Sequence, residues 1–536
     1  MKHSGWGWAW LAASALGLAG CHGTPEPPST PDPVDIPDAG PSPWPTLPEP
    51  GDAVDPGPLA PCSYPATSTF ACGEQAAFEL TACNRGSLSA APTQGVFILN
   101  NRFMPSSTSS QSVLFANAMH LLGGGNTPLL TGAPATTYER DAQSFFLRRD
   151  ALLSDGTATR TAYVGCQLSG AQHLTGCFVT CRNGQVRSSG TFEALRASRR
   201  DGEQEAEGLA LVSESFISLG LPVDVYVAKE HAYVVSLNAN GRTGGLSVFD
   251  VADRAHPVFQ GTVTMPGDSY WNGVWSAGDA LYVASASRGV LVFDIHEPSH
   301  PQFVRSLPED SIDVHTVLVE GDRLYAMSPD PHSETLLFDI SQPLAPALLQ
   351  RFTAPGGDTT GFVHDAFAYQ GRLYINHWDL GYVIADVSNP DHVRQVGRYR
   401  YAHQSSHANA VGTFAGRTVA FEGGESYDAH LRVLDVSNPA HVVKVGEFHL
   451  RPQSSIHNMV LVGSRLYVAW YQEGVRVLDV SEPSQPQQRA YFNTFREMDF
   501  QRGYSFYEGA IGIRVPGDGY VYTVDTSRGL LILREQ

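Results

Sequence analysis

The chain from residue 214 onward alternates short apolar runs with polar turns, and this pattern repeats. Runs such as "ALYVA" and "VLVFD" follow a glycine turn or end at an aspartate with a proline shortly after it. Short runs of this kind are typical of strands rather than helices. The aspartate recurs every 44 to 49 residues, and its six positions are Asp250, Asp294, Asp339, Asp386, Asp435 and Asp479.

A second pattern, Gly-x-x-Leu-Tyr-Val with variations, precedes the aspartate in most repeats, as in "GDALYVA", "GDRLYAM" and "GSRLYVA". One strand is expected before the glycine, one carries Leu-Tyr-Val, one ends at the aspartate and one follows the proline. Four strands in about 45 residues are typical of a β-propeller blade. The 52 Gly and 36 Pro of the chain also favour a turn-rich all-β protein.

The number of repeats predicts a seven-bladed β-propeller over residues 214–536. Six units carry the aspartate, and a seventh at the C-terminus has only three strand-like runs. We expect "SFISLG", at 215–220, to supply the missing outer strand and close the ring, which would remove two exposed sheet edges.

The repeated phrase "VLDVSNP" and its variants resemble the repeat of the LVIVD-repeat family of bacterial and archaeal surface proteins. The resemblance covers roughly 215–536 and implies a propeller, but it says little about activity.

The repeated aspartate itself has a structural explanation. Its carboxylate can accept hydrogen bonds from backbone N–H groups one or two residues further on, as in Asx turns. The proline that follows fixes φ at the start of an outer strand, where its missing N–H costs little. A calcium site made from these aspartates is disfavoured, because each blade supplies only one of them, far from the axis.

The N-terminus has the pattern of an export signal. A short basic start and an apolar run lead to Leu18-Ala19-Gly20-Cys21, which resembles a bacterial lipobox with Cys21 as the lipidated residue. We expect residues 1–21 to be a lipoprotein signal peptide and the protein to be anchored to the cell envelope, at the bacterial outer membrane, by lipid alone. An ordinary secretory signal with an incidental cysteine is the alternative.

Residues 22–61 are predicted to be a disordered, Pro-rich stalk. Positions 24–61 hold 14 Pro and seven acidic residues but no basic ones, so this segment cannot build a core.

Residues 62–197 are predicted to form a small β-rich domain with three disulfides. The even number of cysteines in an exported chain favours disulfides, of which fifteen pairings are possible. A zinc cluster is the alternative, disfavoured because no histidine accompanies the cysteines at ligand spacing. The cysteines are Cys62, Cys72, Cys83, Cys166, Cys177 and Cys181.

Local patterns predict the elements of this domain. Asp155-Gly156 and Asn183-Gly184 each lie between strand-like runs and predict hairpins. Cys177 and Cys181 lie on one face of a predicted strand, too far apart to pair with each other. The run "SVLFANAMHLL" predicts one helix, and residues 198–213 are expected to be a linker.

The charge of the chain excludes one class of partner. The net charge is −19 and no run of Lys and Arg occurs, so nucleic-acid binding is disfavoured.

The candidate functional residues lie on one face of the predicted propeller. Loops that lead into each first strand, and loops from the second to the third strand, open on the face opposite the aspartate turns. Their polar and aromatic residues could form a ligand funnel at the channel mouth. They could equally cap backbone groups and hold channel water. The candidates are Asp224, Trp271, Asn272, His315, His364, Asp365, Trp378, His407, Asn409, His457, Asn458, Trp470 and Glu508.

Three classes of function fit these observations. The absence of a catalytic motif favours a monomeric binding scaffold that holds an envelope or extracellular protein or glycan. The alternative is a metal-dependent enzyme, in which His315, His364 and His457 from separate blades bind a metal ion as the sole cofactor. A purely structural envelope component is the third class.

Overall fold

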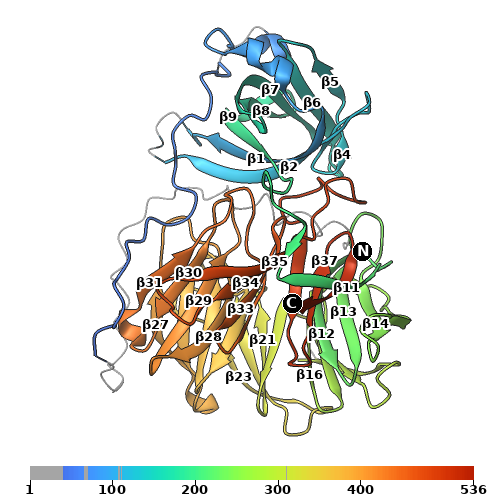
Figure 1. Ribbon diagram of the computed structural model, residues 1–536, viewed down its shortest axis with the longest axis vertical. Helices are drawn as coiled ribbons and strands as arrows, with labels where there is room; N and C mark the ends of the chain where they lie inside the picture. The colour runs from blue at the N-terminus through green and yellow to red at the C-terminus, as the bar shows by residue number, and fades with distance from the viewer. Residues whose placement is uncertain (1–39, 66–69, 107–108, 110, 309–310) are drawn as a thin grey trace.

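The computed structural model describes residues 40–65, 70–106, 109, 111–308 and 311–536, which form two β-rich parts (Figure 1). The larger part, green to red in Figure 1, is the propeller, and the nine-stranded sheet lies above it. The predicted signal peptide and Cys21 lie outside the described residues. Within the described ranges no helix has the length and apolar character needed to span a membrane.

Six of the seven predicted blades are formed by consecutive strands of the chain, each an antiparallel sheet in chain order. Blades 1 to 3 contain β12 (Leu221–Ala228), β13 (His231–Leu237), β14 (Gly245–Asp250), β15 (Val258–Val263), β16 (Trp271–Ala277), β17 (Ala280–Ser285), β18 (Gly289–Asp294), β19 (Gln302–Leu307), β20 (Thr316–Glu320), β21 (Arg323–Ser328), β22 (Glu334–Asp339) and β23 (Ala347–Phe352).

Blades 4 to 6 continue the same pattern, with two short 3₁₀ helices after the aspartate turns of blades 4 and 5. Their elements are β24 (Asp365–Tyr369), β25 (Arg372–His377), β26 (Gly381–Asp386), η4 (Pro390–His392), β27 (Arg394–Tyr399), β28 (Ser406–Phe414), β29 (Arg417–Gly424), β30 (Leu431–Asp435), η5 (Pro439–His441), β31 (Val443–Phe448), β32 (Met459–Val462), β33 (Arg465–Trp470), β34 (Gly474–Asp479) and β35 (Gln487–Phe492).

Blade 7 closes the ring with a strand from before blade 1, as predicted, but from a different segment. Its strands are β36 (Ala510–Arg514), β37 (Val521–Asp525), β38 (Gly529–Glu535) and β11 (Leu209–Ser215), with β11 paired to β38. The expected segment 215–220 mostly follows this strand. Leu209 is buried between blades 6 and 7, whereas Phe216 is 60% exposed, so burial favours the earlier segment.

Residues 198–213 are therefore not a simple linker. The short β10 (Ala206–Glu207) pairs with β35 at the outer edge of blade 6, and β11 begins at Leu209. The propeller thus starts before the predicted residue 214.

The aspartate turns are confirmed as Asx turns on one face of the ring. In each, Oδ1 accepts a hydrogen bond from the backbone N–H two residues further on, at 2.7 to 3.1 Å. Tyrosines of the second pattern link neighbouring blades: the hydroxyl of Tyr233 donates to the Pro298 carbonyl at 2.9 Å, and that of Tyr282 to the Pro343 carbonyl at 2.8 Å. Both patterns therefore build the scaffold.

The N-terminal part is a curved nine-stranded sheet, here called the cap domain, in the order β4-β3-β2-β1-β9-β8-β7-β6-β5. Its elements are η2 (Gln75–Ala77), η3 (Arg85–Ala90), β1 (Gln94–Phe103), β2 (Val113–Leu122), β3 (Leu129–Leu130), β4 (Ala133–Pro134), β5 (Thr137–Arg140), β6 (Phe145–Leu152), β7 (Ala158–Gly170), β8 (His173–Arg182) and β9 (Gln185–Arg196).

The two predicted hairpins of the cap domain are confirmed, and the predicted helix is wrong. Asp155-Gly156 lies between β6 and β7, and Asn183 and Gly184 make the β8–β9 turn with φ of 49° and 77°. The segment expected to be a helix is β2, which pairs along its whole length with β1. Pairing within the sheet here overrides the helix propensity of Ala, Leu and Met.

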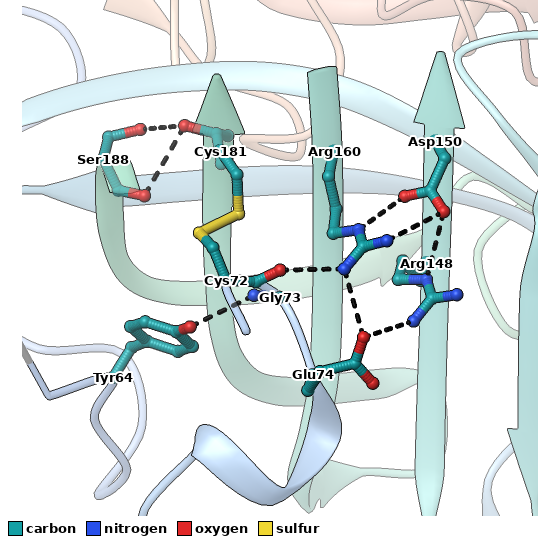
Figure 2. The surroundings of a disulfide bond; sticks show 10 residues. Tyr64, Cys72, Gly73, Glu74, Arg148, Asp150, Arg160, Cys181 and Ser188 are labelled. Carbon is teal, nitrogen blue, oxygen red and sulfur yellow. Dashed lines mark hydrogen bonds and ion pairs between the residues drawn. A yellow bond between two sulfur atoms is a disulfide. The ribbon is translucent and has the colours of Figure 1, made fainter. Parts of the chain in front are cut away.

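Three disulfides attach the first loop of the cap domain to its sheet, and they join Cys62 to Cys177, Cys72 to Cys181 and Cys83 to Cys166. Figure 2 shows the second of these. Beside it, Arg160 donates to the Cys72 carbonyl at 3.0 Å and to Glu74 at 3.1 Å, and it also pairs with Asp150. The loop is thus held by covalent and ionic links together.

Residues 40–61, here called the strap, are not the free stalk that their composition predicts. The strap, dark blue in Figure 1, runs along blades 4 and 5 and then to the cap domain. Glu49 and Asp52 pair with the fully buried Arg432 at 2.9 and 2.7 Å. The acidic residues that suggested disorder instead neutralise a buried guanidinium of blade 5.

The cap domain covers part of the funnel face, which we define as the face opposite the aspartate turns. Val96, Ile98 and Ala118 of its sheet pack against Tyr427, Phe495 and Phe506 from loops of blades 5 to 7. Arg196 and Glu497 form an ion pair across this contact at 2.8 Å. Among the described residues, none from the loops of blades 1 to 4 takes part in this apolar cluster.

Candidate functional site

Four histidines from consecutive blades form a row on the funnel face. His315 and His364 lie just before β20 and β24, His407 lies in β28, and His457 lies just before β32. The Nε2 atoms of His315 and His364 are 2.9 Å apart. The rings of His364 and His407 have centroids 4.0 Å apart, and those of His407 and His457 are 4.5 Å apart. The predicted channel mouth therefore brings these side chains into contact.

Burial keeps the row uncharged at neutral pH. It lowers the pKa of His315 to about 4 and that of His457 to about 3. Burial, reinforced by the neighbouring histidines, holds the pKa values of His364 and His407 well below the usual range. A neutral imidazole carries a lone pair that can accept a hydrogen bond or bind a metal ion.

Glu425 lies against this row, although it was not among the candidates from the sequence. It follows β29 in the loop to β30, and its carboxylate lies 3.3 Å from Nε2 of His407. Burial raises the pKa of Glu425 to about 8, although the hydroxyl of Tyr471 donates to its other oxygen. The available sequence signal was its position in "GGESYDAH", a loop from the second to the third strand of its blade, where funnel-face loops are expected.

An aromatic wall stands beside the row. The half-buried Trp378 stacks on Phe362 with ring centroids 5.1 Å apart and an interplanar angle of 18°. Its ring also lies 5.6 Å from that of His364 and 6.3 Å from that of His407. Trp378 is thus the predicted aromatic residue that lies against the row.

Two other predicted aromatic site residues belong to the core instead. Trp271 and Trp470 are fully buried, and Trp271 packs in the apolar cluster of blades 1 and 7. Trp470 packs between blades 5 and 6, where Nε1 donates to the Ser454 carbonyl at 3.4 Å. Neither side chain is exposed to a ligand.

Several predicted polar residues have structural partners. Asp224 pairs with Arg514 at 3.2 Å, and Asn409 donates to the Tyr374 carbonyl at 3.1 Å. Glu508 accepts bonds from the N–H groups of Gly503, Tyr504 and Ser505, at 2.6 to 3.0 Å. These three residues stabilise the channel wall and the loop before blade 7.

The remaining candidates line the channel near the row. Nδ2 of Asn272 lies 3.0 Å from Nε2 of His315. Burial raises the pKa of Asp365 to about 7, and its Oδ1 accepts a bond from Ala366 at 2.8 Å. The Asn458 carbonyl accepts a bond from the Ala469 N–H at 2.8 Å. Asn272 thus bonds to His315, and the side chain of Asn458 bonds to His457.

The structure brings together a different triad from the predicted one of His315, His364 and His457. One ligand atom each of His364, His407 and Glu425 lies within 4.8 Å of the other two. Nδ1 of His457 instead lies 2.9 Å from the Ile511 carbonyl, and Nε2 of His315 is shared by His364 and Asn272. The cysteines, for which a zinc cluster was the alternative, are all in disulfides.

The funnel face over blades 2 to 4 remains exposed. Its loops present the exposed Asp330, His332, Asp358 and Asp379. Deeper in, burial and the nearby Asp330 raise the pKa of Asp313 to about 7. This open area is acidic and borders the aromatic wall.

Comparison with known proteins adds information about the repeats alone. The LVIVD repeat model matches residues 270–307, 361–400, 426–449 and 457–494. No curated protein matches the chain. The computationally designed Ika8 protein is similar with 10% identity and a TM-score of 0.40, over 60% of this chain and all of that one.

A chain of the mitotic checkpoint complex is similar with 12% identity and a TM-score of 0.45, over 64% of this chain and 97% of that one. The four repeat matches all fall within the seven blades described above. The propeller of this chain therefore contains LVIVD repeats.

Proposed function

We propose that the protein is an exported scaffold that binds a protein or glycan of the cell envelope on the open part of its funnel face, over blades 2 to 4. The observation that carries this proposal is the unequal cover of that face. The cap domain packs against loops of blades 5 to 7, while Asp330, Asp358 and Asp379 stay exposed. Exposed acidic and aromatic groups beside a buried polar mouth are typical of a binding surface.

The charge of the open area suggests the chemistry of the partner. Its exposed acidic side chains favour a partner with basic groups, and electrostatic steering would speed the encounter. The stacked Trp378 and Phe362 add a flat apolar surface for a sugar ring or an aliphatic side chain.

Export and lipid anchoring belong to the same proposal. The lipobox-like Leu18-Ala19-Gly20-Cys21 supports an envelope location, and three disulfides suit an oxidising compartment. The strap would then link the anchor directly to the propeller and the cap domain.

A matched pair of positions on blade 3 tests the proposal. Asp330 and Asp322 are both exposed, but Asp330 lies on the funnel face and Asp322 in the turn on the opposite face. A photo-crosslinking amino acid at either position, in the full-length protein on its own cells, should give a crosslinked partner or glycan adduct from 330 and none from 322. Equal adducts from both positions, or adducts from 322 alone, would contradict the proposal.

A metal-dependent enzyme is the second candidate, favoured by the contact between His364, His407 and Glu425. These residues supply a plausible ligand set, but they identify no substrate.

A further inference from the structure

We propose that His364, His407 and Glu425 form a binding site for a divalent transition metal ion such as Zn²⁺. This inference deepens the proposed function, since His364 of the site belongs to blade 4, at the border of the open funnel face where a partner would bind. Two imidazoles and one carboxylate are the ligand set of many zinc sites that keep a fourth position for water or for a bound group.

The spacing of the ligand atoms suits a single ion. One ligand atom from each residue lies within 4.8 Å of the others, and Nε2 of His407 is 3.3 Å from Glu425 Oε2. A tetrahedral ion with ligand distances of about 2.0–2.2 Å separates its ligand atoms by roughly 3.3–3.6 Å. The His407–Glu425 pair already has this separation.

The hydrogen bonds of His407 leave the correct nitrogen free. Its Nδ1 lies 2.8 Å from the His457 carbonyl, so Nδ1 carries the proton and donates to that oxygen. Nε2 then carries a lone pair directed at Glu425. A backbone carbonyl that holds the far nitrogen of a histidine is the usual outer support of a metal ligand.

His364 has an unpartnered nitrogen for the same role. Because Nδ2 of Asn272 can only donate, Nε2 of His315 is an acceptor, and Nε2 of His364 donates to it. Nδ1 of His364 then carries a lone pair, and it has no hydrogen-bond partner although the residue is only 5% exposed. A buried acceptor without a partner costs free energy, and a bound ion would remove that cost.

Glu425 is held in place by bonds outside the triad. Its backbone N–H donates to the Ser405 hydroxyl at 2.9 Å, and the Tyr471 hydroxyl donates to Oε1. Oε2 is the atom nearer to His407. The carboxylate is therefore oriented by residues from two further loops, as expected for a preorganised ligand.

A second cluster offers a control. His430, Glu447 and His449 also lie within 4.8 Å of one another, but Glu447 already pairs with Lys444 at 2.9 Å and is exposed with His449. His449→Ala removes a histidine there and leaves the channel mouth intact. This variant therefore controls for the loss of one imidazole elsewhere on the same propeller.

The test is metal binding by the purified full-length protein after treatment with a chelator. We expect one Zn²⁺ per chain by mass spectrometry of bound metal, and Co²⁺ in its place should give the visible absorption of a low-symmetry site. His407→Ala and Glu425→Gln should each weaken Zn²⁺ binding by at least about 10-fold, since even outer-shell partners are worth that much. His449→Ala should bind as the wild type does.

Thermal unfolding in the presence of chelator separates metal loss from misfolding. Glu425→Gln keeps the size of the side chain, so its melting temperature without metal should stay close to that of the wild type, while the rise on adding Zn²⁺ should be lost. Substoichiometric metal in the wild type, or equal weakening by His449→Ala, would overturn the metal site. A crosslinked partner at position 330, together with no Zn²⁺ binding, would overturn this inference and leave the proposed function standing. Zn²⁺ binding, together with no crosslinked partner at position 330, would support the metal site and contradict the proposed function.

Discussion

The aspartate that ends the third strand of each repeat stabilises the fold through a few short hydrogen bonds. Asp435 is the most buried of the six and bonds to Arg417 at 2.6 Å as well as to the Ser437 N–H at 3.1 Å. Burial opposes ionisation there, but these bonds hold the pKa of Asp435 below its usual range. Asp294 makes only the turn bond, to His296.

Replacement of these two aspartates should have unequal effects. Asp435→Ala should lower the free energy of unfolding by about 2–3 kcal/mol and Asp294→Ala by about 1 kcal/mol, since bonds to charged groups contribute more when they are buried. The pKa of Asp435 is lowered by folding, so its contribution is complete above the unfolded pKa and is lost as the pH falls through the folded one. Calorimetric melting at pH 7 and pH 2 measures both effects, and equal shifts for the two variants would contradict them.

Prediction at the scale of single residues succeeded where adjacent residues in the sequence determine the conformation. It failed where contacts with residues distant in the sequence determine it. The Asx turn depends on three or four adjacent residues, so "DVSNP" was sufficient to predict it. The contact between His364 and His407 was only implied by equivalent positions in adjacent blades. Glu425 comes from a loop between other strands, and no local pattern distinguishes it from a solvent-exposed glutamate.

The strap is the element whose behaviour the sequence least revealed. Its proline content excludes helix and sheet, but not an extended segment docked on another surface. Arg432 explains why the strap docks, because this side chain is fully buried in blade 5, lies 3.5 Å over the Tyr401 ring and pairs with the strap carboxylates. Burial opposes ionisation of Glu49, yet the bond and charge of Arg432 lower its pKa to about 2.

Removal of one strap carboxylate should detach this element. Asp52→Ala leaves Arg432 partly unpaired and should cost about 3–5 kcal/mol, the usual effect of breaking a buried ion pair. Asp55→Ala, in the same segment, breaks a more exposed pair with Arg102 and should cost about 1 kcal/mol or less. Limited proteolysis within 40–61, together with the melting temperature, distinguishes the two variants, and equally slow cleavage of both would contradict the role of Arg432.

At the scale of the whole molecule, periodicity predicted the ring but not what lies on it. Seven blades followed from the repeats, because each must bury both faces against its neighbours. The cap domain contacts the propeller through Val96, Ile98 and Phe506, apolar residues that read like ordinary core positions. The closing strand is similarly a single unrepeated segment, which explains why its predicted position was six residues late.

Closure of the ring by β11 makes one outer strand more important than the others. Leu211 in β11 and Phe303 in β19 occupy comparable places, with 38% and 45% exposure on outer strands. Proline at either position disturbs a strand of one blade and should cost about 3 kcal/mol locally. Blade 2 remains joined to blades 1 and 3 by the continuous chain, so the ring stays closed when β19 is disturbed.

In blade 7, by contrast, the pairing of β11 with β38 joins the two ends of the propeller without a peptide link. Leu211→Pro should therefore lower the melting temperature by roughly 5 °C or more, and clearly more than Phe303→Pro does. It should also increase hydrogen exchange in β38, which loses its outer neighbour, and in β37 and β36 of the same sheet. Identical melting and exchange in the two variants would mean that the ring is held by packing between blades, with β11 as an ordinary outer strand.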